Sequence, residues 1–197
     1  FFLLLAFVKS LVHSPTMLIS LFHGFNLSLG FFFCYLVVKE FLKREEETIR
    51  QNQLIVEASS ILAGLYYTFS PNPIGWWGFQ LLPMNVVFLN PLLFFLLLRF
   101  FLTGSMRYLL ISLLVTFLFS PNFSFIGAPT FFSFFPLAVL FLFIYTKFIK
   151  KRPIPVVKIA IALLLFVLLQ SFHLIPQIVS ILTPGSFANG FIFGAQG

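Results

Sequence analysis

The chain has 197 residues, of which 60% are hydrophobic and 9% are charged, and its formal net charge is +7. Soluble domains average about 25% charged residues, so this chain lacks the polar side chains that would cover its apolar ones in water. These figures exclude a soluble enzyme, a coiled coil, a disordered tail and, with Cys34 as the single cysteine, a disulfide-stapled domain. The sequence therefore predicts an all-α, polytopic transmembrane helix bundle.

Residues 1–22 begin without an initiating Met, and we expect the chain to be a fragment of a larger membrane protein. Lys9, Ser10 and His13 interrupt the apolar run of this segment and fall on one helical face. This pattern favours an amphipathic helix that lies in the membrane interface, and the end of a truncated span is the alternative.

A membrane-spanning helix needs about 20 mainly apolar residues, and about six segments beyond residue 22 qualify. We predict spans at Phe25–Leu42, Leu54–Phe69, Met84–Leu102, Tyr108–Phe119, Phe131–Phe148 and Val156–Phe172. They are expected to form a transmembrane bundle over 25–172, followed by an outer loop or tail over 173–197. The whole chain, 1–197, is then a single transmembrane domain.

The basic residues indicate the orientation of these spans. Eleven of the twelve Lys and Arg residues lie at alternate connections, over 39–50, 99–107 and 147–158, and only Lys9 lies on the opposite side. The positive-inside rule places the basic connections in the cytoplasm. The net charge is thus a topology signal, so nucleic acid is not expected as a partner. We expect an integral protein of a bacterial or archaeal plasma membrane, with membrane lipid as its partner.

Two of the predicted spans end in the same sequence. Phe69-Ser70-Pro71-Asn72 recurs fifty residues later as Phe119-Ser120-Pro121-Asn122. Proline disfavours a helical backbone at the preceding residue, so each Ser-Pro is expected to stop a helix. Both spans are short, at about 24 Å and about 21 Å, against a hydrocarbon core of about 30 Å. We expect recessed helix ends that help to line a cavity open to the outside, with local thinning of the bilayer as the alternative.

Few polar or helix-breaking residues lie within the predicted spans. Pro91 is expected to kink its span and to free a carbonyl near Val87. Asn85 and Asn90 are expected to form hydrogen bonds between helices. Glu57 lies one turn inside its span, where it either snorkels to the cytoplasmic interface or has a functional role.

No stretch matches a catalytic or metal-binding motif, so we assign no catalytic residue, no metal ligand and no cofactor. Candidate substrate-binding residues lie on the outer side instead. Gln170, His173 and Gln177 recur at i, i+3 and i+7 on one helical face, although an isolated interfacial histidine is more often structural. Trp76 and Trp77 fit an outer aromatic belt, with stacking on a sugar or lipid as the alternative.

Two stretches carry a family resemblance. Residues 30–42 contain Tyr35-Leu36 and lead into a charged cytoplasmic turn, and residues 61–72 end in Tyr67-Thr68-Phe69-Ser70-Pro71. This order resembles the GT-C-type membrane glycosyltransferases, most closely the bacterial arabinofuranosyltransferase-like proteins and uncharacterised multispanning relatives. Residues 80–99 and 172–176 fit the same plan.

The resemblance implies a transferase that takes a sugar from a polyprenyl-phosphate donor on the outer face. In that family an acidic residue of the first outer loop acts as a base or metal ligand, and no residue of this chain matches it. Lys9 is the cation expected for a donor phosphate, assisted by His13, His23 and His173. The alternatives are a non-catalytic membrane module and a transporter or flippase for lipid-linked oligosaccharide, which usually needs ionisable groups near the membrane midplane.

Overall fold

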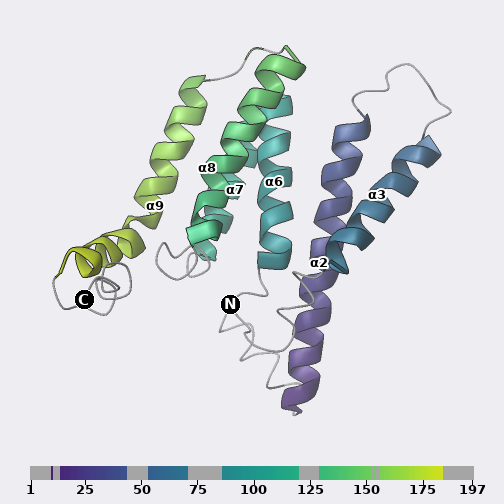
Figure 1. The fold of residues 1–197 in the computed structure, drawn as a ribbon, viewed down its shortest axis with the longest axis horizontal. Coiled ribbons are helices and arrows are strands. Elements are labelled where there is room, and N and C mark those ends of the chain that lie inside the picture. The colour runs from purple at the N-terminus through teal and green to yellow at the C-terminus, as the bar shows by residue number, and fades with distance from the viewer. Residues whose placement is uncertain are drawn as a thin grey trace, which may run out of the picture. The chain divides into compact units, whose positions relative to one another are not determined.

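The computed structural model describes residues 10, 14–43, 53–70, 86–119, 129–151, 153 and 156–183. Over these residues the regular secondary structure is entirely helical (Figure 1). The all-α class predicted from the sequence is therefore confirmed. The chain divides into two compact units, Phe1–Phe95 and Leu96–Gly197, and the boundary falls inside helix α6 (Val86–Thr103).

The first unit opens with helix α2 (Pro15–Lys43), whose start is set by local chemistry. Pro15 occupies the first helical position, where the missing N–H of proline costs nothing because that group has no partner inside the helix. The Oγ of Ser14 accepts a hydrogen bond from the backbone N–H of Met17 at 3.4 Å, as a helix-capping residue does.

Helix α2 overturns one expected boundary. The break between a segment ending at residue 22 and a span beginning at Phe25 is wrong within the described residues, because one helix runs through both. The polar Asn26 does not interrupt this helix, since its Nδ2 donates to the carbonyl of Phe22, one turn earlier, at 2.8 Å. A side-chain donor that bonds within its own helix leaves the backbone pattern intact.

Helix α3 (Gln53–Thr68) agrees with the predicted span to within one residue at each end. It runs antiparallel to α2, because Glu57 faces Tyr35 while Gly64, further along α3, faces Phe31, earlier in α2. The buried residues of α3 recur every four positions and none has a long side chain: Val56, Ser60, Gly64 and Thr68. Small side chains at this spacing let two helix backbones approach closely.

The first part of α6 is hydrogen-bonded to α3 through a backbone carbonyl that proline leaves without a helical partner. Pro91 has no N–H, so the carbonyl of Val87, four residues earlier, receives no helical hydrogen bond. The hydroxyl of Tyr67 in α3 donates to that oxygen at 2.8 Å. The prediction of a freed carbonyl near Val87 is confirmed. The hydrogen bond expected from Asn90 is not confirmed, because within the described residues no donor reaches its buried Oδ1.

The second unit contains the rest of α6, helix α7 (Met106–Leu118), helix α8 (Pro129–Ile144) with a π-helical turn η3 (Tyr145–Ile149), and helix α9 (Val156–Leu182). Gly104 reverses the chain after α6 with a positive φ of 69°, a conformation that favours glycine. Helices α8 and α9 meet at a stacked pair of buried rings, Phe135 and Phe166, whose centroids are 4.5 Å apart.

Helix α9 also differs from its prediction. The span was expected to end at Phe172 and to be followed by a loop or tail, but the helix continues to Leu182. It bends by 65° between its segments Val156–Phe172 and Leu174–Leu182. Pro176 removes one helical hydrogen bond and crowds the preceding turn, which bends a helix without ending it when neighbouring hydrogen bonds persist.

By length and composition, one described helix is long and apolar enough to cross a membrane, Thr16–Leu42. The bent pair in α9 adds a second when it is taken as one span. Three further apolar helices are shorter: Val87–Thr103, Met106–Leu118 and Ser133–Ile149. The structure therefore contains a helix of membrane-spanning length, whereas the expectation of about six spans stays a prediction.

Candidate functional site

Most of the predicted substrate-binding residues lie outside the described part of the chain. Lys9, His13, Trp76 and Trp77 belong to segments that the structure does not describe. His173 lies in α9 at the bend, and Gln177 lies beyond it with a half-buried side chain.

The shared face predicted for Gln170, His173 and Gln177 is not continuous, because the 65° bend falls between Phe172 and Leu174. Gln170 is fully buried, and its Nε2 donates to the carbonyl of Thr116 in α7 at 3.1 Å. That oxygen is among the last four carbonyls of α7, which have no partner inside the helix. Gln170 therefore joins α9 to α7, which is a structural role.

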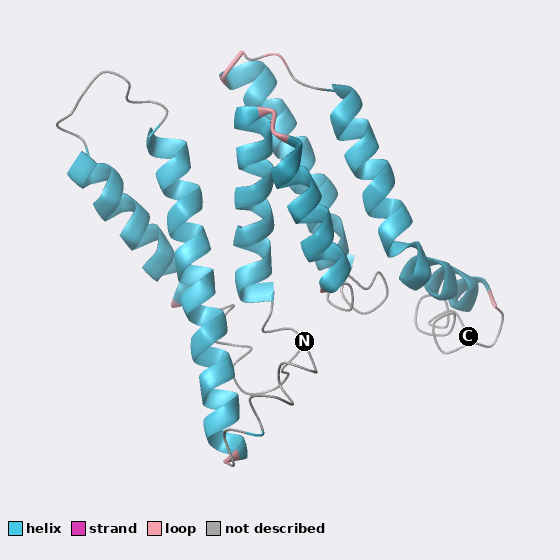
Figure 2. Cartoon of the chain, turned by 180° about the vertical axis from the view of Figure 1, so that it is seen from behind, coloured by secondary structure: helices cyan, strands magenta, loops and turns pink. Residues whose placement is uncertain are grey.

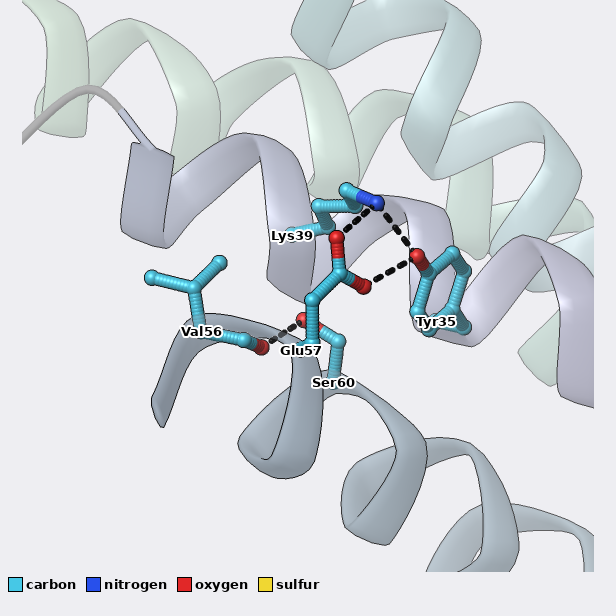
Figure 3. Close-up of polar contacts among 5 residues, drawn as sticks. All are labelled: Tyr35, Lys39, Val56, Glu57 and Ser60. Carbon is cyan, nitrogen blue, oxygen red and sulfur yellow. Dashed lines mark hydrogen bonds and ion pairs between the residues drawn. The ribbon is translucent and has the colours of Figure 1, made fainter. Parts of the chain in front are cut away.

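The described residues contain one charged cluster between helices, formed by Tyr35 and Lys39 of α2 and Glu57 of α3 (Figure 3). The Nζ of Lys39 forms an ion pair with Oε1 of Glu57. The hydroxyl of Tyr35 donates to Oε2 of Glu57 at 2.5 Å and accepts from Nζ of Lys39 at 2.5 Å. The three side chains thus close a triangle in which both carboxylate oxygens are engaged.

Local sequence explains how this cluster assembles. Residues four apart lie on the same face of a helix, which brings Tyr35 and Lys39 together on α2. Glu57 lies in the second turn of α3, where the antiparallel hairpin brings it opposite them. The exposed fractions are 21% for Lys39 and 34% for Glu57, so the pair is partly shielded. Two opposite charges in such an environment attract more strongly than they do in water.

The cluster revises the sequence interpretation of Glu57. Its carboxylate does not reach outward alone, as a snorkelling side chain does, because Lys39 and Tyr35 hold it. Sequence reasoning missed these two partners. The signal was a tyrosine and a lysine four residues apart before a charged turn, followed by a single acid at the start of the next helix. Recognising this signal requires knowing how α2 and α3 are aligned, which the sequence alone does not give.

Two helix ends that were predicted from repeated sequence are confirmed. Helix α3 ends at Thr68, and the Oγ of Ser70 then donates to the carbonyl of Tyr67 at 2.9 Å. Helix α7 ends at Leu118, and the N–H of Phe119 donates to the carbonyl of Val115 at 3.0 Å.

The two helices contain 16 and 13 residues. These lengths correspond to about 24 Å and about 20 Å, less than an average hydrocarbon core. The recess expected beyond each end stays a prediction.

The chain matches no protein-family model, no curated protein and no solved structure. Its own residues therefore carry the functional argument.

Proposed function

We propose that this chain is a polytopic protein of about six membrane spans, with its basic connections in the cytoplasm. We further propose that it forms part of the membrane core of a GT-C-like glycosyltransferase that uses a polyprenyl-phosphate-linked sugar on the outer face. The observation that carries the membrane assignment is the large number of apolar side chains that stay exposed on the helices, together with small or hydroxyl-bearing residues on the buried faces of α3 and α7.

Helix α3 illustrates this pattern. Its buried face includes Ser60 and Gly64, whereas Leu62 and Tyr66 are 66% and 81% exposed. In water each leucine left exposed would forgo about 1.5–3 kcal/mol of burial free energy. In lipid the same side chain meets hydrocarbon and loses nothing, while the small face makes the helix contact.

In the second unit the buried face of α7 is mixed, with two leucines beside two hydroxyl residues, and large apolar side chains are exposed on α7 and α9. The buried face of α7 includes Ser112 and Thr116, whose hydroxyls donate to carbonyls three residues earlier, Leu109 and Leu113, at 2.7 and 2.8 Å. Hydroxyls that are satisfied by their own helix are compatible with a low-dielectric surrounding. The outward residues of α7 and α9 are mainly leucine, isoleucine, valine and phenylalanine: Leu110, Ile111, Leu114, Phe117, Leu118, Val157, Ile161, Leu164, Val167 and Leu168.

The glycosyltransferase assignment rests on the resemblance of residues 30–42 and 61–72 and on the short helices α3 and α7. In this proposal Lys9, His13 and His173 contact the donor phosphate, because cations and imidazoles are the groups that suit it. Trp76, Trp77 and Gln177 contact the sugar or its lipid carrier. Ion-coupled transport is less well supported, because Glu57 is already paired with Lys39 and held by Tyr35.

Cysteine labelling tests the orientation and the recess. In a Cys34→Ala background, Ser70→Cys and Ser120→Cys are expected to react with an impermeant maleimide in intact cells. Ser105→Cys, in the turn between α6 and α7, serves as the matched control and should react only after permeabilisation. Labelling of Ser105→Cys in intact cells would overturn the orientation, and failure to label both outer positions would count against an open recess.

A transfer assay tests the activity. Membranes containing the chain are supplied with a polyprenyl-phosphate-linked sugar, and transfer is followed for Lys9→Gln and His173→Ala. Both changes are expected to abolish transfer at unchanged expression, whereas Lys43→Gln, at a cytoplasmic connection, should leave it intact. Undiminished transfer in both outer variants refutes the assigned binding residues, and no transfer by any variant or by the parent favours a non-catalytic membrane module.

A further inference from the structure

The net charge of the protein belongs to one of its two units. All five acidic residues lie between Glu40 and Glu57, in the unit Phe1–Phe95, together with five of the twelve basic residues. The first unit is therefore neutral. The second unit, Leu96–Gly197, contains the remaining seven basic residues and no acidic residue. The second unit thus carries the entire +7.

The fold gathers these cations at one end of the second unit. The Nζ of Lys158, in the first turn of α9, donates to the carbonyl of Gly104 between α6 and α7 at 3.2 Å. At the same turn, Nη2 of Arg99 donates to the hydroxyl of Tyr108 at 3.1 Å. The α6–α7 turn and the chain after η3 lie at the same end of this unit (Figure 2). We call this the basic end; its described cations are Arg99, Arg107, Lys147, Lys150, Lys151 and Lys158.

Aromatic rings lie beside several of these cations. The guanidinium of Arg99 lies 5.3 Å from the ring centre of Tyr108. The ammonium of Lys147 lies 5.5 Å from the ring centre of Phe143, and that of Lys150 lies 5.7 Å from that of Tyr145. A cation over an aromatic face keeps its full charge and most of its N–H donors.

The contrast with the first unit is direct, because there Lys39 is neutralised by Glu57. The second unit has no acidic residue of its own that could neutralise its cations in the same way.

We propose that the basic end is a binding site for the phosphate headgroup of an anionic phospholipid in the cytoplasmic leaflet. This inference rests on the orientation proposed above, which brings the basic end to the depth of the lipid headgroups. Lys and Arg groups at that depth attract anionic headgroups, and arginine pairs well with phosphate oxygens. The acyl chains of such a lipid find an apolar surface next to Lys158, where Val156 and Val157 are 60% and 73% exposed.

Native mass spectrometry of the full chain in mild detergent measures the dissociation constant for the first bound phosphatidylglycerol and, separately, phosphatidylcholine. The parent is expected to bind phosphatidylglycerol more tightly. Removing one cation near an anionic headgroup should raise its dissociation constant about fivefold, so this is the shift expected for Arg107→Gln and for Lys158→Gln. Arg107 has an exposed side chain, which makes its variant the safer of the two for folding. The matched control is the charge-neutral pair Lys39→Gln with Glu57→Gln, expected to leave the constant unchanged.

Equal dissociation constants for the two lipids would overturn the proposal, as would an equal loss in the control pair. Displacement of phosphatidylglycerol by equimolar inorganic phosphate would assign the site to a soluble anion and would also overturn it. The labelling of Ser105→Cys separates this test from the proposed orientation. If that residue reacts from outside while phosphatidylglycerol still binds selectively, the orientation fails and the headgroup site is placed on the opposite leaflet. If the orientation holds and selectivity is absent, the lipid site alone fails.

Discussion

Replacing Gly30 with alanine is expected to destabilise the first unit, although alanine is the better helix former. A Cβ at Gly30 would lie 2.9 Å from Cγ1 of Val87 and 3.0 Å from its carbonyl oxygen. Neither atom can move without a cost in stability, because the methyl is on a short branched side chain and the oxygen accepts a hydrogen bond from Tyr67. The added methyl therefore pushes α2 away from α6 within this unit or breaks the Tyr67 hydrogen bond.

Gly24 supplies the matched control, because it lies in the same helix and a Cβ there would meet nothing within 4 Å. Gly24→Ala should stabilise the protein by up to about 1 kcal/mol through helix propensity. Gly30→Ala gains the same amount but also carries an overpacking cost of about 1–3 kcal/mol. The propensity gain cancels in the difference between the two variants, which should therefore be about 1–3 kcal/mol.

The free energy of unfolding of both variants is measured by titrating the purified protein from mild-detergent micelles into SDS, with circular dichroism as the readout. Gly64→Ala on α3 tests the contact between α3 and α2 in the same way. Its Cβ would lie 2.8 Å from Cδ2 of Phe31 and 3.0 Å from the carbonyl oxygen of the same residue. Equal shifts for Gly24→Ala and Gly30→Ala would refute the close approach of α2 to α6 at Val87.

Three further predictions concern the polar contacts. Lys39→Gln and Glu57→Gln should each destabilise the protein, and in a double-mutant cycle the cost of the double variant should be smaller than the sum of the two single costs; additive costs would contradict the pairing. Gln170→Leu should lower the free energy of unfolding by about 1 kcal/mol, because it leaves a buried carbonyl of α7 without its donor; an unchanged unfolding curve would show that this bond contributes nothing. Gly104→Ala should cost about 1 kcal/mol through its positive φ alone, since there is open space at this position, and a gain in stability would argue against that backbone conformation.

Local signals made some of the helices predictable. The ends of α3 and α7 are encoded by Ser-Pro sequences, which act on the residue immediately before the proline and need no tertiary partner. The start of α2 and the end of α9 were misjudged for the opposite reason. The continuation of α2 past Phe22 and of α9 past Phe172 depends on hydrogen bonds and packing that a sequence pattern leaves open.

The charged cluster shows the same limit at the level of the site. Glu57 stood out because an acid within an apolar segment is costly. Its partners Tyr35 and Lys39 did not, because their meeting depends on how two antiparallel helices are aligned. The substrate contacts proposed for Lys9, His13, Trp76 and Trp77 lie outside the described residues and stay predictions. The transfer assay with Lys9→Gln addresses the first of these residues directly.

The pairing of Lys39 with Glu57 has a consequence for biosynthesis. Helix α2 leaves the ribosome first, and its lysine meets no opposite charge from α3 until that helix has followed. A single carboxylate entering hydrocarbon costs a few kcal/mol, and an ion pair formed beforehand offsets part of this cost. We therefore expect α2 and α3 to leave the translocon together as a closed hairpin. Lys39→Gln would then delay the membrane integration of α3 while leaving that of α2 unchanged.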